Sequence, residues 1–485
     1  MPDMSQNIPV FVDLDGTLVR TDIAQELLMR SFTSAGTVRS LAAAALRDGR
    51  SGVKRVLSDV SDLRADLLPY NQAVLDHIRA AREQGRTVVL ATAADRVVAE
   101  QIAEHTGLFD AVLASEPGRN LKGAAKLEAI RAFAGGDDFE YLGDTMADMP
   151  IWQAAARRGF VNPPGPAQAL DAAEPDRTSL HVEDRKPAFG QILKAMRPHQ
   201  WAKNGLVLLP LLFSHSYGDP ASVLAALAAF LIFSLCASAV YLINDMVDID
   251  ADRAHAKKRH RPFAAGRLAP VTGAMAAAGL FTFSILAAFL AVGTLFGLVL
   301  LAYVALTTAY SFFLKQRATV DVVLLALLFT IRIIAGAAAI GVELTPWLLN
   351  FALFFFLSLA YMKRYIEISR SAAAGKVPSR DYSPDDLGTV QAFGIANGTA
   401  SLLMLALYLN SQTASEQYAS PTLLWLSFPV MVFWICRAWM EASRGRIDDD
   451  PVVYVLKDRT SLIAVGVVLA IVIGARYIAF GGIAA

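Results

Sequence analysis

The sequence predicts two parts, a soluble α/β domain followed by an all-α membrane domain of about nine spans. Hydrophobic residues make up 55% of the 485, but they are unevenly distributed. The N-terminal part alternates short apolar strands with helical stretches, whereas the C-terminal part alternates apolar runs of spanning length with short polar loops. Prolines gather between the two parts. We place the α/β domain, the linker and the membrane domain, in chain order, at residues 1–170, 171–190 and 191–485.

Charge and cysteine content narrow the class of protein. The formal net charge is zero, and we expect no nucleic acid among the partners. Cys236 and Cys436 both lie in apolar runs, and this pair supports neither a disulfide framework nor a zinc site. The first six residues lack the basic and apolar regions of a signal peptide, so we expect the first domain to stay in the cytoplasm.

The α/β domain begins with a strand that ends in two aspartates. Residues 8–12 are apolar and run directly into Asp13-Leu14-Asp15-Gly16-Thr17. Parallel sheets present catalytic groups at the carboxyl ends of their strands, so Asp13 and Asp15 are suited to act as a nucleophile and a partner acid.

Three further elements follow in order. A second strand ends in the hydroxyl of Thr92, Lys122 lies between strands, and a third strand leads into Gly143-Asp144-Thr145-Met146-Ala147-Asp148. The four elements together resemble the motifs of the haloacid dehalogenase-like phosphatases.

That resemblance implies a role for each motif residue. Asp13 would form an aspartyl-phosphate and Asp15 would be the general acid and base. Thr92 and Lys122 would bind the phosphoryl group. Mg²⁺ would be held by the motif carboxylates, namely Asp13, Asp15, Asp144 and Asp148.

A small helical cap is expected over residues 21–80. Its helical patterns cover Ile23–Phe32, Val38–Leu46 and Val53–Leu63. Caps of this kind select the substrate, and this cap does not reveal which one.

The membrane domain carries nine candidate spans. They cover about residues 204–218, 221–243, 271–292, 295–313, 320–341, 346–362, 391–410, 422–440 and 461–481. The loops after even-numbered spans hold 17 Lys and Arg residues, and the loops between spans on the opposite side hold none. The positive-inside rule predicts a multi-pass protein of the inner membrane whose N-terminal domain and basic loops face the cytoplasm.

An acidic stretch follows the second span. Asp245, Asp248 and Asp252 have the spacing i, i+3, i+7 and would share one face of a continuing helix, beside Asn244. Three carboxylates together favour a cation, and Mg²⁺ prefers such oxygen ligands and is completed by substrate phosphates. Downstream basic residues, Arg261 among them, could neutralise the remaining phosphate charge.

Other polar residues of interest lie at the same membrane face or within spans, where charged groups mark functional sites by default. We expect these residues to bind substrate: Lys203, Asn204, Asn244, Arg261, Tyr310, Lys315, Asp321, Arg332, Lys363 and Arg364. Lys315, Lys363 and Arg364 could instead be snorkelling anchors.

The motif Asn244-Asp245-x-x-Asp248-x-x-x-Asp252 within an apolar domain resembles the UbiA superfamily of intramembrane prenyltransferases. Where aromatic prenyltransferases of that family carry a second aspartate-rich motif, this chain has Lys363-Arg364-Tyr365-Ile366-Glu367. The departure counts against a quinone or haem prenyltransferase, and the chain instead resembles the branch of decaprenyl-phosphate phosphoribosyltransferases.

That branch implies a reaction and a set of partners. Phosphoribose would move from phosphoribosyl pyrophosphate to a polyprenyl phosphate lipid, with release of pyrophosphate, to make a precursor of arabinosyl donors for the cell envelope. Asp245, Asp248 and Asp252 would be the catalytic and Mg²⁺-binding residues. The phosphatase-like domain would remove the 5-phosphate of the lipid product. Other copies of the chain are allowed as partners in a homo-oligomer.

Two alternatives stay open at this point. One is a UbiA-type aromatic prenyltransferase with a degenerate second motif. The other is a membrane-tethered phosphatase whose helical bundle is not catalytic.

Overall fold

The computed structural model divides the chain into two units, each of which is described by itself. The first unit comprises residues 1–198 and 241–279, and the second comprises residues 199–240 and 280–485. The structure describes every residue except 1–7, 32–62, 117, 374–380, 448–449 and 479–485.

A six-stranded parallel sheet forms the centre of the first unit, in the order β3-β2-β1-β4-β5-β6. The strands are β1 (Val10–Val12), β2 (Val88–Asp95), β3 (Ala111–Ser115), β4 (Glu140–Gly143), β5 (Arg157–Val161) and β6 (Thr178–Val182). β1 lies between β2 and β4, with Val10 opposite Val88 on one side and Glu140 on the other. The strand order reverses between β1 and β4, and α/β sheets bind ligands at the carboxyl ends of such strands.

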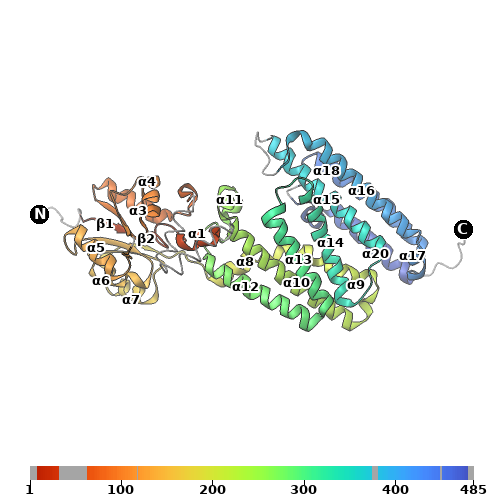
Figure 1. Ribbon diagram of the computed structural model, residues 1–485, viewed down its shortest axis with the longest axis horizontal. Coiled ribbons are helices and arrows are strands. Elements are labelled where there is room, and N and C mark those ends of the chain that lie inside the picture. Colours follow the sequence, from red (N-terminus) through yellow and green to blue (C-terminus); the bar gives the residue numbers. More distant parts are fainter. Residues whose placement is uncertain (1–7, 32–62, 117, 374–380, 448–449, 479–485) are drawn as a thin grey trace. The chain divides into compact units, whose positions relative to one another are not determined.

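Helices cover both faces of the sheet (Figure 1). They are α3 (Gln72–Glu83), α4 (Arg96–Thr106), α5 (Ala124–Ala134), α6 (Met149–Ala154) and α7 (Gly165–Ala173), while α1 (Ile23–Ser31) lies beyond the end of the sheet. Side chains alternate along β1, so that Val10 and Val12 pack into a core with Ile78 of α3, while Phe11 packs into a second core with Trp152 of α6. The strands are apolar on both faces because both faces are buried.

The cap and linker differ in part from expectation. Helix α1 matches the expected cap helix at Ile23–Phe32. Val38–Leu46 lies outside the described residues, as does all of Val53–Leu63 except Leu63. The expected linker at 171–190 instead supplies β6, which pairs with β5, so the α/β domain continues at least to Val182. The prolines around this segment suggested a linker, but it contains a short strand at the edge of the sheet. Proline is tolerated at edge strands because one side of such a strand forms no ladder hydrogen bonds.

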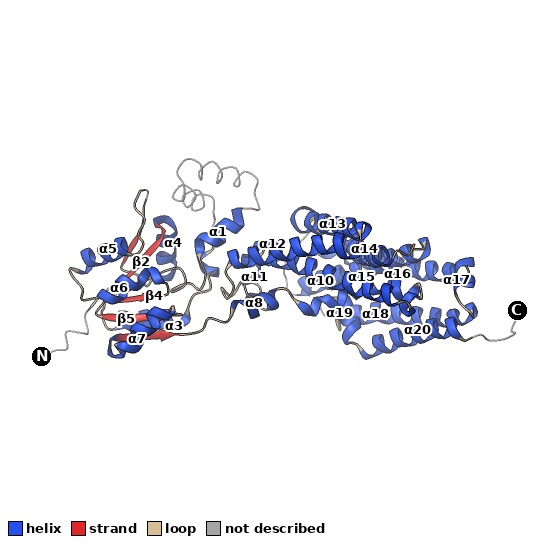
Figure 2. Ribbon diagram, turned by 90° about the horizontal axis from the view of Figure 1, so that it is seen from below, coloured by secondary structure: helices blue, strands red, loops and turns tan. Residues whose placement is uncertain are grey.

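The rest of the chain is helical (Figure 2). Its helices are α8 (Ala188–Ala195), α9 (Leu209–Phe213), α10 (Pro220–Val247), α11 (Ile249–Ala254), α12 (Pro270–Ala287), α13 (Thr294–Ala309), α14 (Val320–Ile340), α15 (Pro346–Ala373), α16 (Leu387–Leu409), α17 (Gln412–Gln417), α18 (Ser427–Ser443), α19 (Pro451–Lys457) and α20 (Arg459–Tyr477). Within the described residues, eight helices are long and apolar enough to cross a membrane, one fewer than expected. Leu224 and Leu290 are 70% and 84% exposed, as suits side chains that face lipid.

The expected span that the structure does not form as a long helix is the first one, at residues 204–218. This stretch forms a 3₁₀ helix, η5 (Pro198–Leu208), and the five-residue α9. Pro210 supplies no backbone N–H, and His215 has a φ of +58°, so regular α-helix is interrupted at both points.

Candidate active sites

The first site is a carboxylate cluster at the reversal point of the sheet. Asp13 follows β1, Asp144 follows β4, and Asp148 ends the 3₁₀ helix η3 (Met146–Asp148). One oxygen from each of these three buried side chains lies within 4.8 Å of the other two. Asp144 Oδ1 has no hydrogen-bond partner among the described residues. Three hard oxygen donors with an unpartnered lone pair fit a Mg²⁺ ion.

Gly16 permits this close arrangement. Its φ is +78°, and a Cβ at this position would lie 2.1 Å from Asp144 Oδ2. Any larger residue would therefore both strain the turn after β1 and displace the carboxylate.

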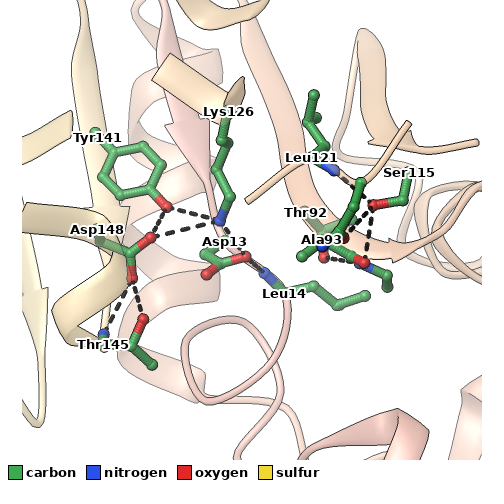
Figure 3. A network of polar contacts seen from close by, with 12 residues as sticks. Asp13, Leu14, Thr92, Ala93, Ser115, Leu121, Lys126, Tyr141, Thr145 and Asp148 are labelled. Atoms are coloured by element: carbon green, nitrogen blue, oxygen red, sulfur yellow. Dashed lines mark hydrogen bonds and ion pairs between the residues drawn. The ribbon is translucent and has the colours of Figure 1, made fainter. Parts of the chain in front are cut away.

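Lys126, which the sequence analysis did not single out, supplies the positive charge of the cluster. Its Nζ lies 3.0 Å from Asp13 Oδ1 and 3.5 Å from Asp148 Oδ1 (Figure 3). Lys122 is exposed instead, so the structure gives Lys126 the place that was expected for Lys122. Lys126 and Ile130 are one turn apart on the buried face of α5, and that spacing could have identified the lysine.

Three donors orient Asp148. The Tyr141 hydroxyl donates to Asp148 Oδ1 at 2.6 Å, and it accepts a hydrogen bond from Lys126 Nζ at 3.0 Å. The backbone N–H and the hydroxyl of Thr145 donate to Asp148 Oδ2 at 3.0 and 2.9 Å. Figure 3 shows Tyr141, Lys126, Asp148 and Asp13 converging on one point.

Burial disfavours the ionised forms of the carboxyl groups in this cluster. It raises the pKa of Asp13 to about 6, with Lys126 opposing and Asp148 adding to the rise. Burial and the charges of Asp13 and Asp148 raise the pKa of Asp144 to about 8. A divalent cation would restore the charged forms of these carboxyls, since it adds positive charge where Lys126 alone is insufficient.

Asp15 and Thr92 are two further residues of the expected phosphatase motifs. Burial, followed by the charge of Asp22, raises the pKa of Asp15 to about 7, and Asp15 Oδ1 accepts a hydrogen bond from the N–H of Ile23 at 2.9 Å. Thr92 is fully buried within β2, and its Oγ1 accepts a hydrogen bond from the N–H of Ala94 at 3.0 Å.

The acidic stretch 244–252 forms a second cluster within the first unit. Helix α10 ends at Val247, and Asp248 is the residue before α11, without a capping hydrogen bond from its side chain. The N–H of Asp252 donates to the carbonyl of Asp248 at 2.8 Å. Arg261 Nη1 lies between two buried carboxylates, 2.6 Å from Asp252 Oδ2 and 3.1 Å from Asp245 Oδ1.

This second cluster is already neutralised in part. Arg197 also donates to Asp245 Oδ1, while Asp245 Oδ2 has no hydrogen-bond partner among the described residues. The three motif aspartates do not form a compact three-carboxylate group such as the described residues contain at Asp13. Mg²⁺ was expected between Asp245 and Asp252, and the guanidinium group of Arg261 lies there in the structure. The carboxylate oxygens of these two aspartates therefore can bind a positively charged group.

In the second unit, Lys203 forms an ion pair with Asp450, the residue that caps α19. Burial opposes ionisation of Asp450, but the charges of Lys203 and Lys363 outweigh it and lower the pKa of this carboxyl. The positive charges of two lysines thus stabilise the ionised form of one carboxyl group.

Asp321 and Arg364 form a buried pair within the second unit. Arg364 Nε lies 2.5 Å from Asp321 Oδ2, and the Tyr382 hydroxyl donates to Asp321 Oδ1 at 2.8 Å. Arg364 also pairs with Glu367, one turn along α15. Neither Arg364 nor Asp321 exposes more than 1% of its side chain. Nη2 of Arg364 nevertheless has no hydrogen-bond partner among the described residues.

Arg332 is likewise held within the bundle. Its Nε donates to Asn204 Oδ1 at 2.9 Å, and its Nη1 donates to the carbonyl of Leu328. Three aromatic rings surround the guanidinium, with centroids 5.3–5.5 Å from Cζ: Phe233, Tyr303 and Phe329. Cation–π contacts and hydrogen bonds can stabilise a charge inside the bundle without a ligand.

The remaining expected residues are half-buried: Asn244, Tyr310, Lys315 and Lys363. Tyr310 begins a π-helical turn, η9 (Tyr310–Leu314), a kind of irregularity that is frequent at functional sites.

Comparison with known proteins matches both parts. The model of the UbiA prenyltransferase family matches residues 206–463, which is more than half of the chain. The model of the haloacid dehalogenase-like hydrolases matches residues 10–153.

Individual relatives and a solved structure are similar to different shares of this chain. The uncharacterized protein y4nM of Sinorhizobium fredii is 36% identical over 461 residues, covering 94% of this chain and 89% of that protein. The decaprenyl-phosphate phosphoribosyltransferase of Corynebacterium glutamicum is 36% identical over 249 residues, covering 49% of this chain and 73% of the relative. A solved UbiA homolog from Archaeoglobus fulgidus, bound to GPP and Mg²⁺, is 16% identical with a TM-score of 0.46 and covers 59% of this chain and 100% of that one. The chain belongs to the UbiA prenyltransferase family and carries a haloacid dehalogenase-like domain at its N-terminus.

Proposed function

We propose that the membrane domain transfers 5-phosphoribose from phosphoribosyl pyrophosphate to a polyprenyl phosphate of the decaprenyl type. We further propose that the N-terminal domain removes the 5-phosphate from the lipid product. Relatives named decaprenyl-phosphate phosphoribosyltransferase support the first step. The basic loops support placing both activities at the cytoplasmic face of the inner membrane.

A cavity in the second unit is the observation that carries the proposal. Its volume is about 560 Å³, and apolar side chains from α9, α14, α15, α16, α18 and α20 form most of its wall. Among its described lining residues, Lys203 and Glu343 are the charged ones. An apolar cavity with a lysine in its wall suits a lipid whose head group is an anion.

The charge beside that cavity favours phosphate. Lys203 and Lys363 both lower the pKa of Asp450, and in this proposal the two lysines also bind a substrate phosphate. Lys363 and Arg364 stand where an aromatic prenyltransferase would carry acids, which supports a donor other than an isoprenyl diphosphate.

The transfer needs few proton movements. An oxygen of the lipid phosphate forms a bond to ribose C1 as the bond from C1 to the pyrophosphate oxygen breaks, and pyrophosphate leaves as an anion. The lipid phosphate is already ionised, so no base is required. In this proposal Arg261 and the half-buried Asn244 contribute donors to the phosphates.

Bound Mg²⁺ would offset phosphate charge in both domains, held by Asp13, Asp144 and Asp148 in one and by Asp245, Asp248 and Asp252 in the other. In the N-terminal domain, Asp13 attacks the phosphorus of the ribose 5-phosphate while Asp15 gives its proton to the departing ribose oxygen. Asp15 then takes a proton from the water that releases phosphate from Asp13. A pKa of about 7 lets Asp15 serve in both directions near neutral pH.

The test uses purified full-length protein with radiolabelled phosphoribosyl pyrophosphate and polyprenyl phosphate. We expect wild type to label the lipid fraction with a dephosphorylated ribosyl lipid, and Asp13→Asn to accumulate the phosphorylated one. Identical lipid products from both proteins would refute the phosphatase role.

Donor competition separates the alternatives. Wild type and Lys363→Ala are compared for Mg²⁺-dependent binding of phosphoribosyl pyrophosphate and of a prenyl diphosphate. Binding of the prenyl donor alone would establish the aromatic prenyltransferase instead. Phosphatase activity without any labelled lipid would indicate a tethered phosphatase.

A further inference from the structure

A buried ion pair links the phosphatase-like domain to the acidic loop within the first unit. Glu26 of α1 receives two hydrogen bonds from the guanidinium of Arg253 in α11, at 2.6 and 2.9 Å. Glu26 and Arg253 are 1% and 8% exposed, and 226 residues separate them in the chain. Bidentate carboxylate–guanidinium pairs fix orientation as well as distance.

Glu26 and Arg253 each lie close in the chain to a residue with a proposed catalytic or metal-binding role or to a partner of such a residue. Helix α1 begins at Ile23, whose N–H binds Asp15, and Glu26 is one turn further on. Arg253 directly follows Asp252 in α11, and its Nε donates to the carbonyl of Ala264 at 3.0 Å. Arg253 thereby ties α11 to the segment that also carries Arg261.

Two neighbouring contacts join the same segments. Gly266 has a φ of +66°, and a Cβ there would lie 2.9 Å from Cβ of Arg20. The N–H of Val271, in the first turn of α12, approaches Oε1 of Gln25 at 3.5 Å. Residues 20–26 and residues 253–271 are therefore in contact at several points, and the ion pair is the buried part of this interface.

Stability alone does not explain such a pair. Removing both charges from water is costly, and well-packed apolar residues of similar volume usually serve stability as well or better. What the charged pair adds is a defined geometry, because only one arrangement satisfies both carboxylate oxygens.

We propose that Glu26 and Arg253 are positioning residues that couple the two centres, so that the phosphatase-like domain holds α11, and with it Asp252 and Arg261, in the geometry that binds pyrophosphate. The inference rests on the proposed transferase function. It implies that a carboxylate of the N-terminal domain controls donor binding by the membrane enzyme without contacting the donor.

The experiment measures transfer kinetics of the full chain for wild type, Glu26→Gln, Arg253→Gln and the double variant. We expect each single variant to raise the KM for phosphoribosyl pyrophosphate about tenfold, within the usual range of coupling between sites, with kcat changed by less than about twofold. The double variant should be no worse than the singles, because all three lose the same interaction. The matched control is Glu100→Gln, an exposed carboxylate paired with Arg96 on α4, which should match wild type.

Hydrogen exchange gives a readout that needs no substrate. Glu26→Gln should speed amide exchange in residues 249–265, and Arg253→Gln should speed it in α1, while Glu100→Gln changes neither. Unchanged KM in the single variants, or multiplied effects in the double variant, would overturn the coupling. Unchanged exchange would overturn it too, even if wild type transferred no phosphoribose, an outcome that would separately refute the proposed function.

Discussion

The two carboxylate clusters of the first unit both bring buried acidic groups close together, but they differ in the positive charge beside those groups. Around Asp13, the amino group of Lys126 contacts Asp13 and Asp148, and the exposed Arg185 lies 3.9 Å from Asp144. The pKa values of Asp13 and Asp144 still rise to about 6 and about 8. Around Asp245, the guanidinium groups of Arg197 and Arg261 face the buried carboxylates. The positive charge at the first cluster does not offset the effect of burial on its carboxyls, whereas the second cluster has two guanidinium groups at its carboxylates.

The difference bears on how each cluster would use a cation. The Asp13 cluster gains directly when a divalent ion binds, since the ion relieves repulsion that burial makes severe. The Asp245 cluster already has cationic partners, so a metal and a phosphate together would have to compete with Arg261 for its oxygens. Mg²⁺ alone should therefore bind the first cluster more readily, and the second cluster only with pyrophosphate present.

The largest expected effect tests the second cluster. Asp248→Asn or Asp245→Asn should lower transfer by about a hundredfold to a thousandfold, because each change removes charge from the proposed metal-binding set. Hydrolysis of a generic phosphomonoester by the same protein should be unaffected. Asp385→Asn, an exposed carboxylate before α16, is the control. Transfer near the wild-type rate at limiting Mg²⁺ would remove these aspartates from the mechanism.

The next effect tests the first cluster. Lys126→Met should reduce phosphomonoester hydrolysis by about a hundredfold, because the only described ammonium group beside Asp13 is lost from a buried site. Lys122→Met is the matched control, four residues away and exposed, and should retain nearly full activity. The opposite ranking of the two variants would restore Lys122 to the role that the sequence suggested.

These residues show what the sequence could predict. The two-part fold and the family are confirmed, because apolar run length and short ordered motifs are local signals. Asp13 and Asp144 could be placed together because parallel strands bring their carboxyl ends to one edge. Lys126 was missed because a motif gives the order of residue types, while the direction of a side chain depends on the start of helix α5.

Other features depend on contacts distant in sequence. β6 becomes a strand because β5 offers it an edge, and its composition alone resembles a linker. Arg332 was expected to bind substrate because it lies within a span. In the fold its guanidinium donates a hydrogen bond to Asn204 and contacts three aromatic rings. The pairing of Glu26 with Arg253 has no local signature at all.

A smaller effect concerns pH. The pKa values of Asp13 and Asp144 are raised above their unfolded value of 3.8, so the stability that these protonated groups contribute is lost as pH rises through about 6 and then about 8. Mg²⁺ competes with the same protons, so its affinity for the metal-free protein should rise at least about tenfold between about pH 6 and about pH 8. Calorimetric titration at both pH values measures this change, and Asp144→Asn should flatten it. An affinity independent of pH would show that these carboxyls are already ionised without metal.

The smallest effect isolates the Tyr141 hydroxyl, the one partner of Asp148 that also contacts Lys126. Tyr141→Phe keeps the ring in the core but leaves Asp148 Oδ1 with Lys126 alone, at 3.5 Å. Losing one hydrogen bond to a charged group typically costs about 1.5–3 kcal/mol, and the Thr145 donors keep Asp148 in place, so we expect hydrolysis to fall about tenfold. Tyr70→Phe is the control, since its hydroxyl donates to the carbonyl of Ala65, away from the cluster. If Tyr141 only fills space, both variants will hydrolyse substrate alike; if it also orients Asp148, added Mg²⁺ should recover part of the loss in Tyr141→Phe, because the ion can fix the carboxylate that the hydroxyl no longer holds.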